Sequence, residues 1–257
     1  MLFPHAALYN LDAHKSNPVN MILGALGMII NNILYLGGVW VLFFAGKEQN
    51  AQIVPYFAGL TALTTTSWGA LNFFFGGLRN LGTTISNGNL EVFMATPRNV
   101  LTLAGISQSD VVSLGDFLMG VACIILLGIY LSPDFALRVV IACIFSFLAF
   151  AGLFVFSSSL AFFLPRGGGV ATLINSIIMF LSIYPTGKIF EGTGRLILLL
   201  TPVAATAILP MEAVENASLS SFGLAFLVSL AFFFASVIFF HFGMKRYQVV
   251  NVINLSK

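Results

Sequence analysis

Charged residues are scarce in this chain, and their scarcity limits the class of protein it can be. Only 8% of the 257 residues are Asp, Glu, Lys or Arg, whereas 58% are hydrophobic. A soluble domain carries roughly 25% charged residues, because it has to cover its core with polar surface. The formal net charge is only +2, which gives no support for nucleic-acid binding. The composition predicts an integral membrane protein.

Residues and motifs that build catalytic or metal sites are also few. The two cysteines, Cys123 and Cys143, lie inside apolar runs and are typical of small core residues. The sequence has no H-E-x-x-H or H-x-x-E-H metal pair and no G-x-x-x-x-G-K-[ST] phosphate loop. We therefore expect no enzyme activity and no metal or cofactor in this chain.

Long apolar runs make up most of the remaining sequence. About 20 apolar residues cross a bilayer as a helix, and six runs meet or approach that length: 19–45, 53–75, 111–131, 137–164, 170–189 and 222–242. A further run at 196–209 is short and contains Pro202, which favours a re-entrant hairpin over a full span. The pattern predicts an all-α polytopic membrane protein with six transmembrane helices.

The basic residues indicate the orientation of these helices. With six spans both termini share one side, which would hold Lys15, Arg79, Arg98, Arg166, Lys245, Arg246 and Lys257. The other side would hold Lys47, Arg138, Lys188 and Arg195. By the positive-inside rule, both termini are predicted to be cytoplasmic. We expect one domain over 1–257, with a cytoplasmic loop at 76–110 and an external region at 188–221. Residues 1–18 fit either an interfacial helix or a disordered tail.

The stretch 88–99, GNLEVFMATPRN, is the most structured part of the predicted cytoplasmic loop. Asn87 or Asn89 can cap a short helix there, and Pro97 would end it. A short rigid helix transmits a push better than a flexible loop, so we expect it to dock on another protein. An elbow helix that packs under the spans is the alternative.

Uncharged polar residues inside the spans form a second group of candidates. They are Thr64, Thr65, Ser67 and Asn72 in the second span, with Asn175 and Ser176 in the fifth. Such side chains either bond neighbouring helices or line a cavity. The hydroxyl cluster of the second span is therefore expected to face a partner helix or a translocation path. Asp110 or Ser109 is expected to cap the start of the third span.

Four features, in this order along the chain, resemble the membrane subunit of type-2 ABC exporters of the bacterial six-span permease branch. They are SNGNLE with MATPRN at 86–99, Tyr184-Pro185 with Phe190, Gly192 and Arg195, PVA at 202–204 with Leu209-Pro210, and GMKRY at 243–247. The spacing from Tyr184-Pro185 to Phe190 is one residue longer than the family pattern. We therefore expect the local geometry of the gate in this region to differ from that of the family.

The resemblance implies that the loop after the second span holds a coupling helix that docks on a separate ABC ATPase subunit. The residues implied are Ser86, Asn87, Gly88, Asn89, Leu90, Glu91, Phe93, Pro97 and Arg98, with Leu90 and Phe93 as apolar anchors. ATP and Mg²⁺ would bind to that ATPase. A second permease subunit, identical or related, would complete the assembly among the lipids of the bacterial cytoplasmic (inner) membrane.

The resemblance also implies that the second and fifth spans line the translocation path between two permeases. Thr64, Thr65, Ser67, Asn72, Asn175 and Ser176 would then face the path, and Tyr184, Pro185 and Pro202 would form an external gate. A secondary transporter or channel is disfavoured by the lack of intramembrane carboxylates and inverted repeats. A polytopic membrane enzyme or assembly factor is disfavoured by the lack of clustered His, Asp or Cys.

Overall fold

The computed structural model describes residues 18–43 and 50–255, which form helices joined by short connections. The helices are α2 (Pro18–Phe43), α3 (Asn50–Ser86), α4 (Glu91–Met94), α5 (Val100–Ile106), η1 (Val111–Ser113), α6 (Leu114–Tyr130), α7 (Pro133–Ser159), η2 (Leu160–Phe162), α8 (Gly167–Ile183), α9 (Thr186–Ile189), α10 (Gly192–Leu199), η3 (Ala204–Ile208), α11 (Leu209–Asn216) and α12 (Leu219–Leu255). Within these ranges there is no strand. The interfacial segment expected at 1–18 lies outside the described residues, apart from Pro18.

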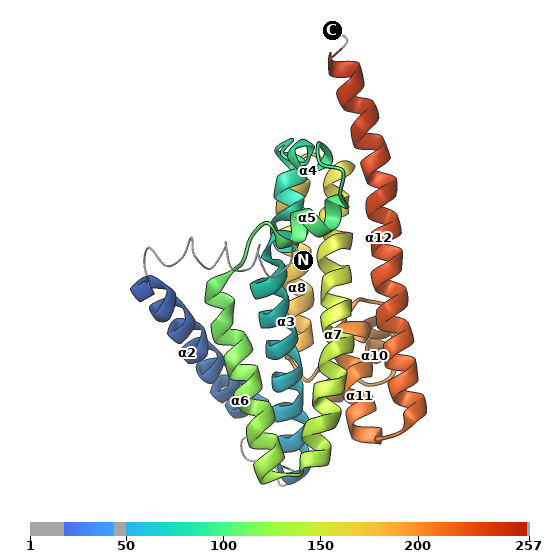
Figure 1. Ribbon diagram of the computed structural model, residues 1–257. Helices are drawn as coiled ribbons and strands as arrows, with labels where there is room; N and C mark the ends of the chain where they lie inside the picture. Colours follow the sequence, from blue (N-terminus) through green and yellow to red (C-terminus); the bar gives the residue numbers. More distant parts are fainter. Residues whose placement is uncertain (1–17, 44–49, 256–257) are drawn as a thin grey trace.

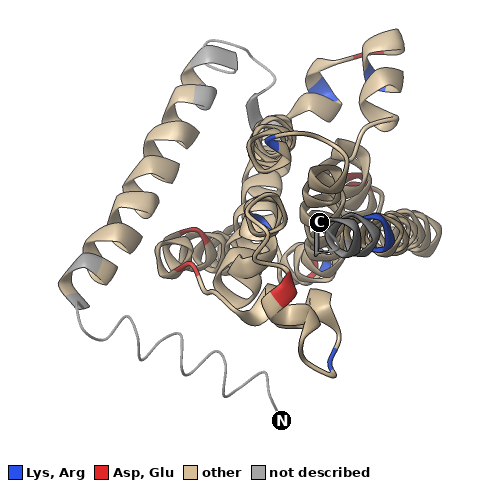
Figure 2. Cartoon of the chain, turned by 90° about the horizontal axis from the view of Figure 1, so that it is seen from above, with Lys and Arg blue, Asp and Glu red and all other residues tan. Residues whose placement is uncertain are grey.

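Helix α3 is the central helix of the bundle. It packs against α6, α7 and α8, and α12 packs against the far side of α7 (Figure 1). Helix α2 contacts α6 and η1 at the edge, and it is strongly tilted relative to α12, which Figure 2 shows nearly end-on. The few charged residues are widely spaced in the same view.

The two ends of the bundle differ. Helices α4 and α5 lie at one end, together with the C-terminal part of α12, and we call this the α4–α5 end. Helices α10 and α11 lie towards the other end, beside α7 and α12 (Figure 1). The loop and the external region predicted from the sequence therefore occupy opposite ends of the bundle.

Apolar composition supports a polytopic membrane protein but does not by itself give six spans. Four segments of the described chain are long and apolar enough to cross a membrane: Met21–Gly38, Val111–Tyr130, Pro133–Phe162 and Leu219–Tyr247. A fifth is added if α10 and the η3–α11 segment, which meet at an angle of 95°, count as one broken span. Helix α8 is apolar but short, and α3 carries many hydroxyl groups that lower its hydropathy. Six spans therefore stay a prediction.

The end of α3 differs from the sequence-based expectation. The second span was expected to end at residue 75, whereas α3 continues to Ser86 past a kink at Phe75, whose φ is −133° and ψ is 37°. The physical reason is close packing, because a side chain at Gly77 would collide with the carbonyl oxygen of Ala104 in α5. Gly76 and Gly77 thus permit contact with the next segment rather than ending the helix.

Candidate functional site

The segment that was expected to contact a partner follows α3 at the α4–α5 end. Ser86 ends α3, and Gly88 has a φ of 77°, a left-handed conformation that favours glycine. Only Glu91–Met94 are then helical. The short helix expected in this stretch is therefore a single helical turn, and a non-helical turn at 87–90 precedes it. We call residues 86–98 the coupling segment.

Side chains of the coupling segment divide into inward and outward groups. Leu90 is completely buried in the chain's own core, and Phe93 packs partly against the same core. This corrects the expectation that Leu90 is an anchor for another protein, since its side chain supports the segment from within. Glu91, Pro97 and Arg98 are exposed, as is Val92, with 70% of its surface accessible.

Two long-range hydrogen bonds attach the region of the coupling segment to the bundle. The Tyr247 hydroxyl of α12 donates to the carbonyl oxygen of Gly88 at 3.0 Å. The Gly168 N–H at the start of α8 donates to Ser86 Oγ at 2.9 Å. These two bonds connect the region of the coupling segment to α8 and to α12.

The hydroxyl cluster of α3 is enclosed by helices of this same chain. Thr64, Thr65, Ser67 and Asn72 are all buried. Thr64 and Thr65 donate to carbonyl oxygens one turn earlier in α3, while Ser67 donates to the carbonyl oxygen of Cys143 in α7 at 3.0 Å. Of the two roles expected for Thr64, Thr65 and Ser67, this environment favours contact with a partner helix.

Asn175 and Ser176 of α8 do line a cavity, which we call the α3–α8 pocket. It has a volume of about 250 Å³ and lies between α3, α8 and the connection that precedes η1. Its lining consists of Trp68, Gly76, Arg79, Asn80, Gln108, Ser109, Asp110, Thr172, Asn175 and Ser176. Sequence reasoning missed Arg79, Asn80 and Gln108 as site residues, because the part of α3 beyond residue 75 was taken for a loop.

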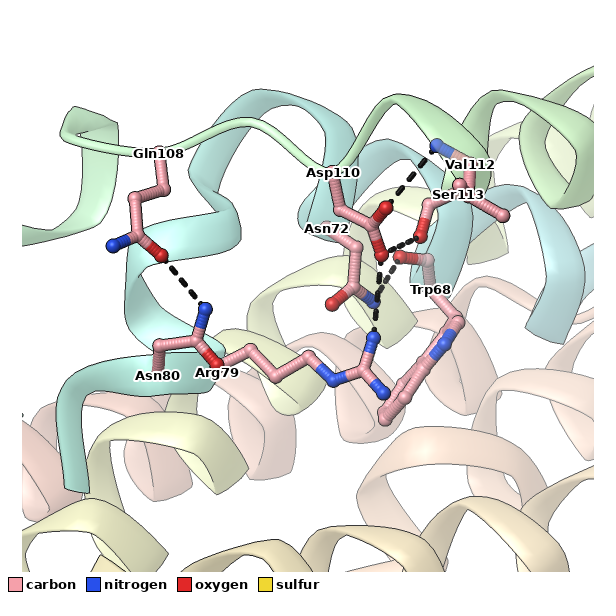
Figure 3. Close-up of polar contacts among 8 residues, drawn as sticks. All are labelled: Trp68, Asn72, Arg79, Asn80, Gln108, Asp110, Val112 and Ser113. Carbon is pink, nitrogen blue, oxygen red and sulfur yellow. Dashed lines mark hydrogen bonds and ion pairs between the residues drawn. The ribbon is translucent and has the colours of Figure 1, made fainter. Parts of the chain in front are cut away.

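Hydrogen bonds hold one wall of the pocket in place (Figure 3). Asp110 Oδ1 accepts from the Val112 N–H at 3.1 Å, and Asp110 Oδ2 accepts from the Ser113 hydroxyl at 2.8 Å and from Arg79 at 3.3 Å. Asn80 Nδ2 donates to Gln108 Oε1 at 2.7 Å. Asp110 therefore caps η1, as expected, and also fixes the connection against α3.

Two buried amides near this end lack part of their hydrogen bonding. Asn175 Oδ1 accepts from the Ser157 hydroxyl at 2.7 Å, but Asn175 Nδ2 has no partner within the described part of the chain. The same holds for Asn72 Oδ1, whose Nδ2 donates to the Trp68 carbonyl oxygen at 2.8 Å. Buried polar atoms are nearly always paired, so the unpaired Nδ2 of Asn175, a residue that lines the α3–α8 pocket, marks a place suited to a polar ligand.

The expected gate residues lie at the opposite end. Tyr184 follows α8 and packs edge-on against Tyr35 of α2, and Pro185 precedes α9. Pro202 lies at the bend after α10, where its carbonyl oxygen accepts from the Thr206 N–H at 3.0 Å. The Thr206 hydroxyl also meets the Ser182 hydroxyl of α8 at 2.7 Å. The structure thus joins the end of α8 to the bend.

Ion pairs surround a second cavity at this end, with a volume of about 430 Å³. Lys188 pairs with Glu215 at 3.0 Å, and Arg195 pairs with Glu212. These four residues line the cavity together with Tyr56. These ion pairs join α9 and α10 to α11.

Across residues 18–43 and 50–255, no three His, Cys, Asp or Glu residues gather into a group that could hold a metal ion.

Comparison with known proteins identifies the family. A search of curated proteins gives no match. The family model described as ABC-2 family transporter protein matches residues 56–250, from the start of α3 into the last turns of α12. The chain therefore belongs to the ABC-2 transporter family of membrane proteins.

Proposed function

We propose that this chain is the permease subunit of an ATP-driven ABC exporter in the bacterial cytoplasmic membrane. It would form half of the translocation pathway and would be driven by a separate ATPase subunit that binds ATP and Mg²⁺. The observation that carries the proposal is the family match over residues 56–250, combined with an exposed coupling segment braced against α8 and α12.

In this proposal α2, α3, α6, α7, α8 and α12 are the six spans, and α10–α11 is a re-entrant hairpin on the external side. The α4–α5 end faces the cytoplasm together with both termini. The distribution of basic residues supports this orientation, since the α4–α5 end carries Arg79, Arg98, Arg166, Lys245 and Arg246, and the other end carries Arg138, Lys188 and Arg195.

The exposed side chains Glu91, Val92, Pro97 and Arg98 form the proposed contact surface for the ATPase. Closure of the ATPase would move this surface, and the bonds at Gly88 and Ser86 would transmit the movement to α12 and α8. A second permease subunit would complete the pathway. Catalysis of ATP hydrolysis belongs to the ATPase in this arrangement, and the present chain supplies the route.

Substitution of the contact surface tests the proposal. Val92→Asp places a charge on an exposed apolar position of the coupling segment, and Thr193→Asp places one on an exposed position of α10 at the opposite end. We expect Val92→Asp to abolish co-purification of the ATPase and substrate-stimulated ATP hydrolysis, while Thr193→Asp preserves both. Equal ATPase binding by the two variants would refute the assignment of the surface.

A further inference from the structure

The α3–α8 pocket has the chemistry of a small ligand site. We propose that it binds an anionic, oxygen-rich group, with phosphate as the best fit, and that this group is the polar head of the transported molecule. The role as cargo site rests on the proposed function, but binding to the pocket can be measured without transport. The argument depends on which hydrogen-bonding groups of the pocket remain available.

The strongest acceptors that line the pocket are already occupied. Asp110 uses both carboxylate oxygens to hold η1 and Arg79 (Figure 3). Gln108 Oε1 accepts from Asn80, and Asn175 Oδ1 accepts from Ser157. Asp110 thus uses three of its roughly four acceptor sites within the chain.

Strong donors are, in contrast, available. Asn175 is only 4% exposed, and its Nδ2 has no partner in the described part of the chain. The Arg79 side chain is 47% exposed, and among the described residues it makes a single ion pair, with Asp110 at the long distance of 3.3 Å. Exposed pairs of this kind are weak, so the guanidinium can turn to a ligand at little cost. Arginine and amide N–H groups together suit a phosphate oxygen cluster.

The volume of the pocket limits the ligand to a head group. Complete drug-sized ligands occupy pockets of about 300–1,000 Å³, which exceeds the volume of about 250 Å³ found here. Trp68 lies beneath Arg79, with 6.0 Å between the guanidinium carbon and the centre of the indole ring. A group bound by Arg79 therefore lies beside an aromatic ring whose fluorescence can report on it.

The test uses Trp68 as the reporter. The chain has two tryptophans, so Trp40→Phe leaves Trp68 as the single fluorophore. The purified variant in detergent is titrated with inorganic phosphate, with dihexanoyl phosphatidic acid, and with dihexanoylglycerol as the analogue without phosphate. Equilibrium dialysis of labelled phosphate gives a second measure of binding. We expect saturable binding of a phosphate-bearing probe and none of dihexanoylglycerol.

Charge variants in the Trp40→Phe background test whether the pocket prefers an anionic ligand. Arg79→Gln should weaken binding roughly tenfold, which is the usual effect of losing one charge-assisted hydrogen bond. Asp110→Asn should strengthen binding, because Asn also caps a helix start while removing the negative charge. Lys245→Gln removes an exposed cation of α12 outside the pocket and should leave binding unchanged.

Each outcome decides a part of the proposal. Binding of inorganic phosphate alone identifies a free anion as the ligand, whereas binding of phosphatidic acid alone identifies an amphiphile head. No saturable binding by either method, or weaker binding in Asp110→Asn, overturns the proposal. Intact binding in a protein that does not transport with its ATPase would count against the proposed function and leave the pocket assignment standing.

Discussion

At the scale of single residues, the hydrogen bond from Tyr247 to Gly88 is the most direct link between the coupling segment and α12. Tyr247→Phe removes the hydroxyl but keeps the ring contact with Phe162. Loss of such a bond costs about 1 kcal/mol, or a factor of about 5 in the population of the braced state. We expect the variant to hydrolyse ATP normally and to transport less substrate per ATP.

The control for this prediction is Tyr130→Phe, because Tyr130 is 80% exposed and is the last residue of α6, whose C-terminal end lies away from α4 and α5. Its ratio of transport to ATP hydrolysis, measured in proteoliposomes, should equal that of the unmodified protein. If Tyr247→Phe also keeps the normal ratio, the hydrogen bond contributes nothing to coupling.

Individual side chains also show what the sequence could and could not predict. The cap at Asp110 followed from residue type and position. A buried hydrogen bond of 2.7 Å from Asn32 Nδ2 to Asp116 Oδ1 joins α2 to α6. This bond could not be predicted from the sequence, because 84 residues separate the two partners. The inward orientation of Leu90 was also missed, because its neighbours in the core come from distant parts of the chain. The local sequence pattern does not show which of these lie beneath the turn.

At the scale of elements, glycine decides how closely α3 and α6 approach. A Cβ atom added at Gly120 would lie 2.5 Å from the backbone nitrogen of Thr66, and one added at Gly69 would collide with the backbone of Phe117. Gly120→Ala should therefore destabilise the protein by about 1–3 kcal/mol, as overpacking of a tight interface does. Thermal unfolding in detergent should give a lower midpoint.

The matched substitution is Gly27→Ala in α2, where no described atom outside the neighbouring helix backbone lies within 4 Å of the added atom. Alanine is the better helix former by about 1 kcal/mol, so this variant should be neutral or slightly more stable. An unfolding midpoint of Gly120→Ala as high as that of Gly27→Ala would mean that α3 and α6 do not cross at these glycines.

Helices were easier to predict than their ends and neighbours. The apolar runs predicted the positions of α2, α6, α7, α8 and α12, and most of the predicted ends lie within a few residues of the observed ones. The prediction succeeds because a long apolar run has few other stable structures in a membrane. The extension of α3 through Gly76 and Gly77 was not predicted, because its cause is contact with α5. The α3–α8 pocket was missed in turn, since that extension carries Arg79 and Asn80.

At the scale of the whole molecule, the opposite positions of the coupling segment and of α10 make a prediction about topology (Figure 1). Cys123→Ala and Cys143→Ala remove both native thiols, and Thr96→Cys or Thr193→Cys then places a single thiol at an exposed site at either end. In intact cells a membrane-impermeant maleimide should label Thr193→Cys, whereas Thr96→Cys should react only after permeabilisation. The cysteine-free protein should remain unlabelled throughout. Labelling of both sites from outside would contradict the cytoplasmic position of the coupling segment, and with it any route by which an internal ATPase could drive α8 and α12.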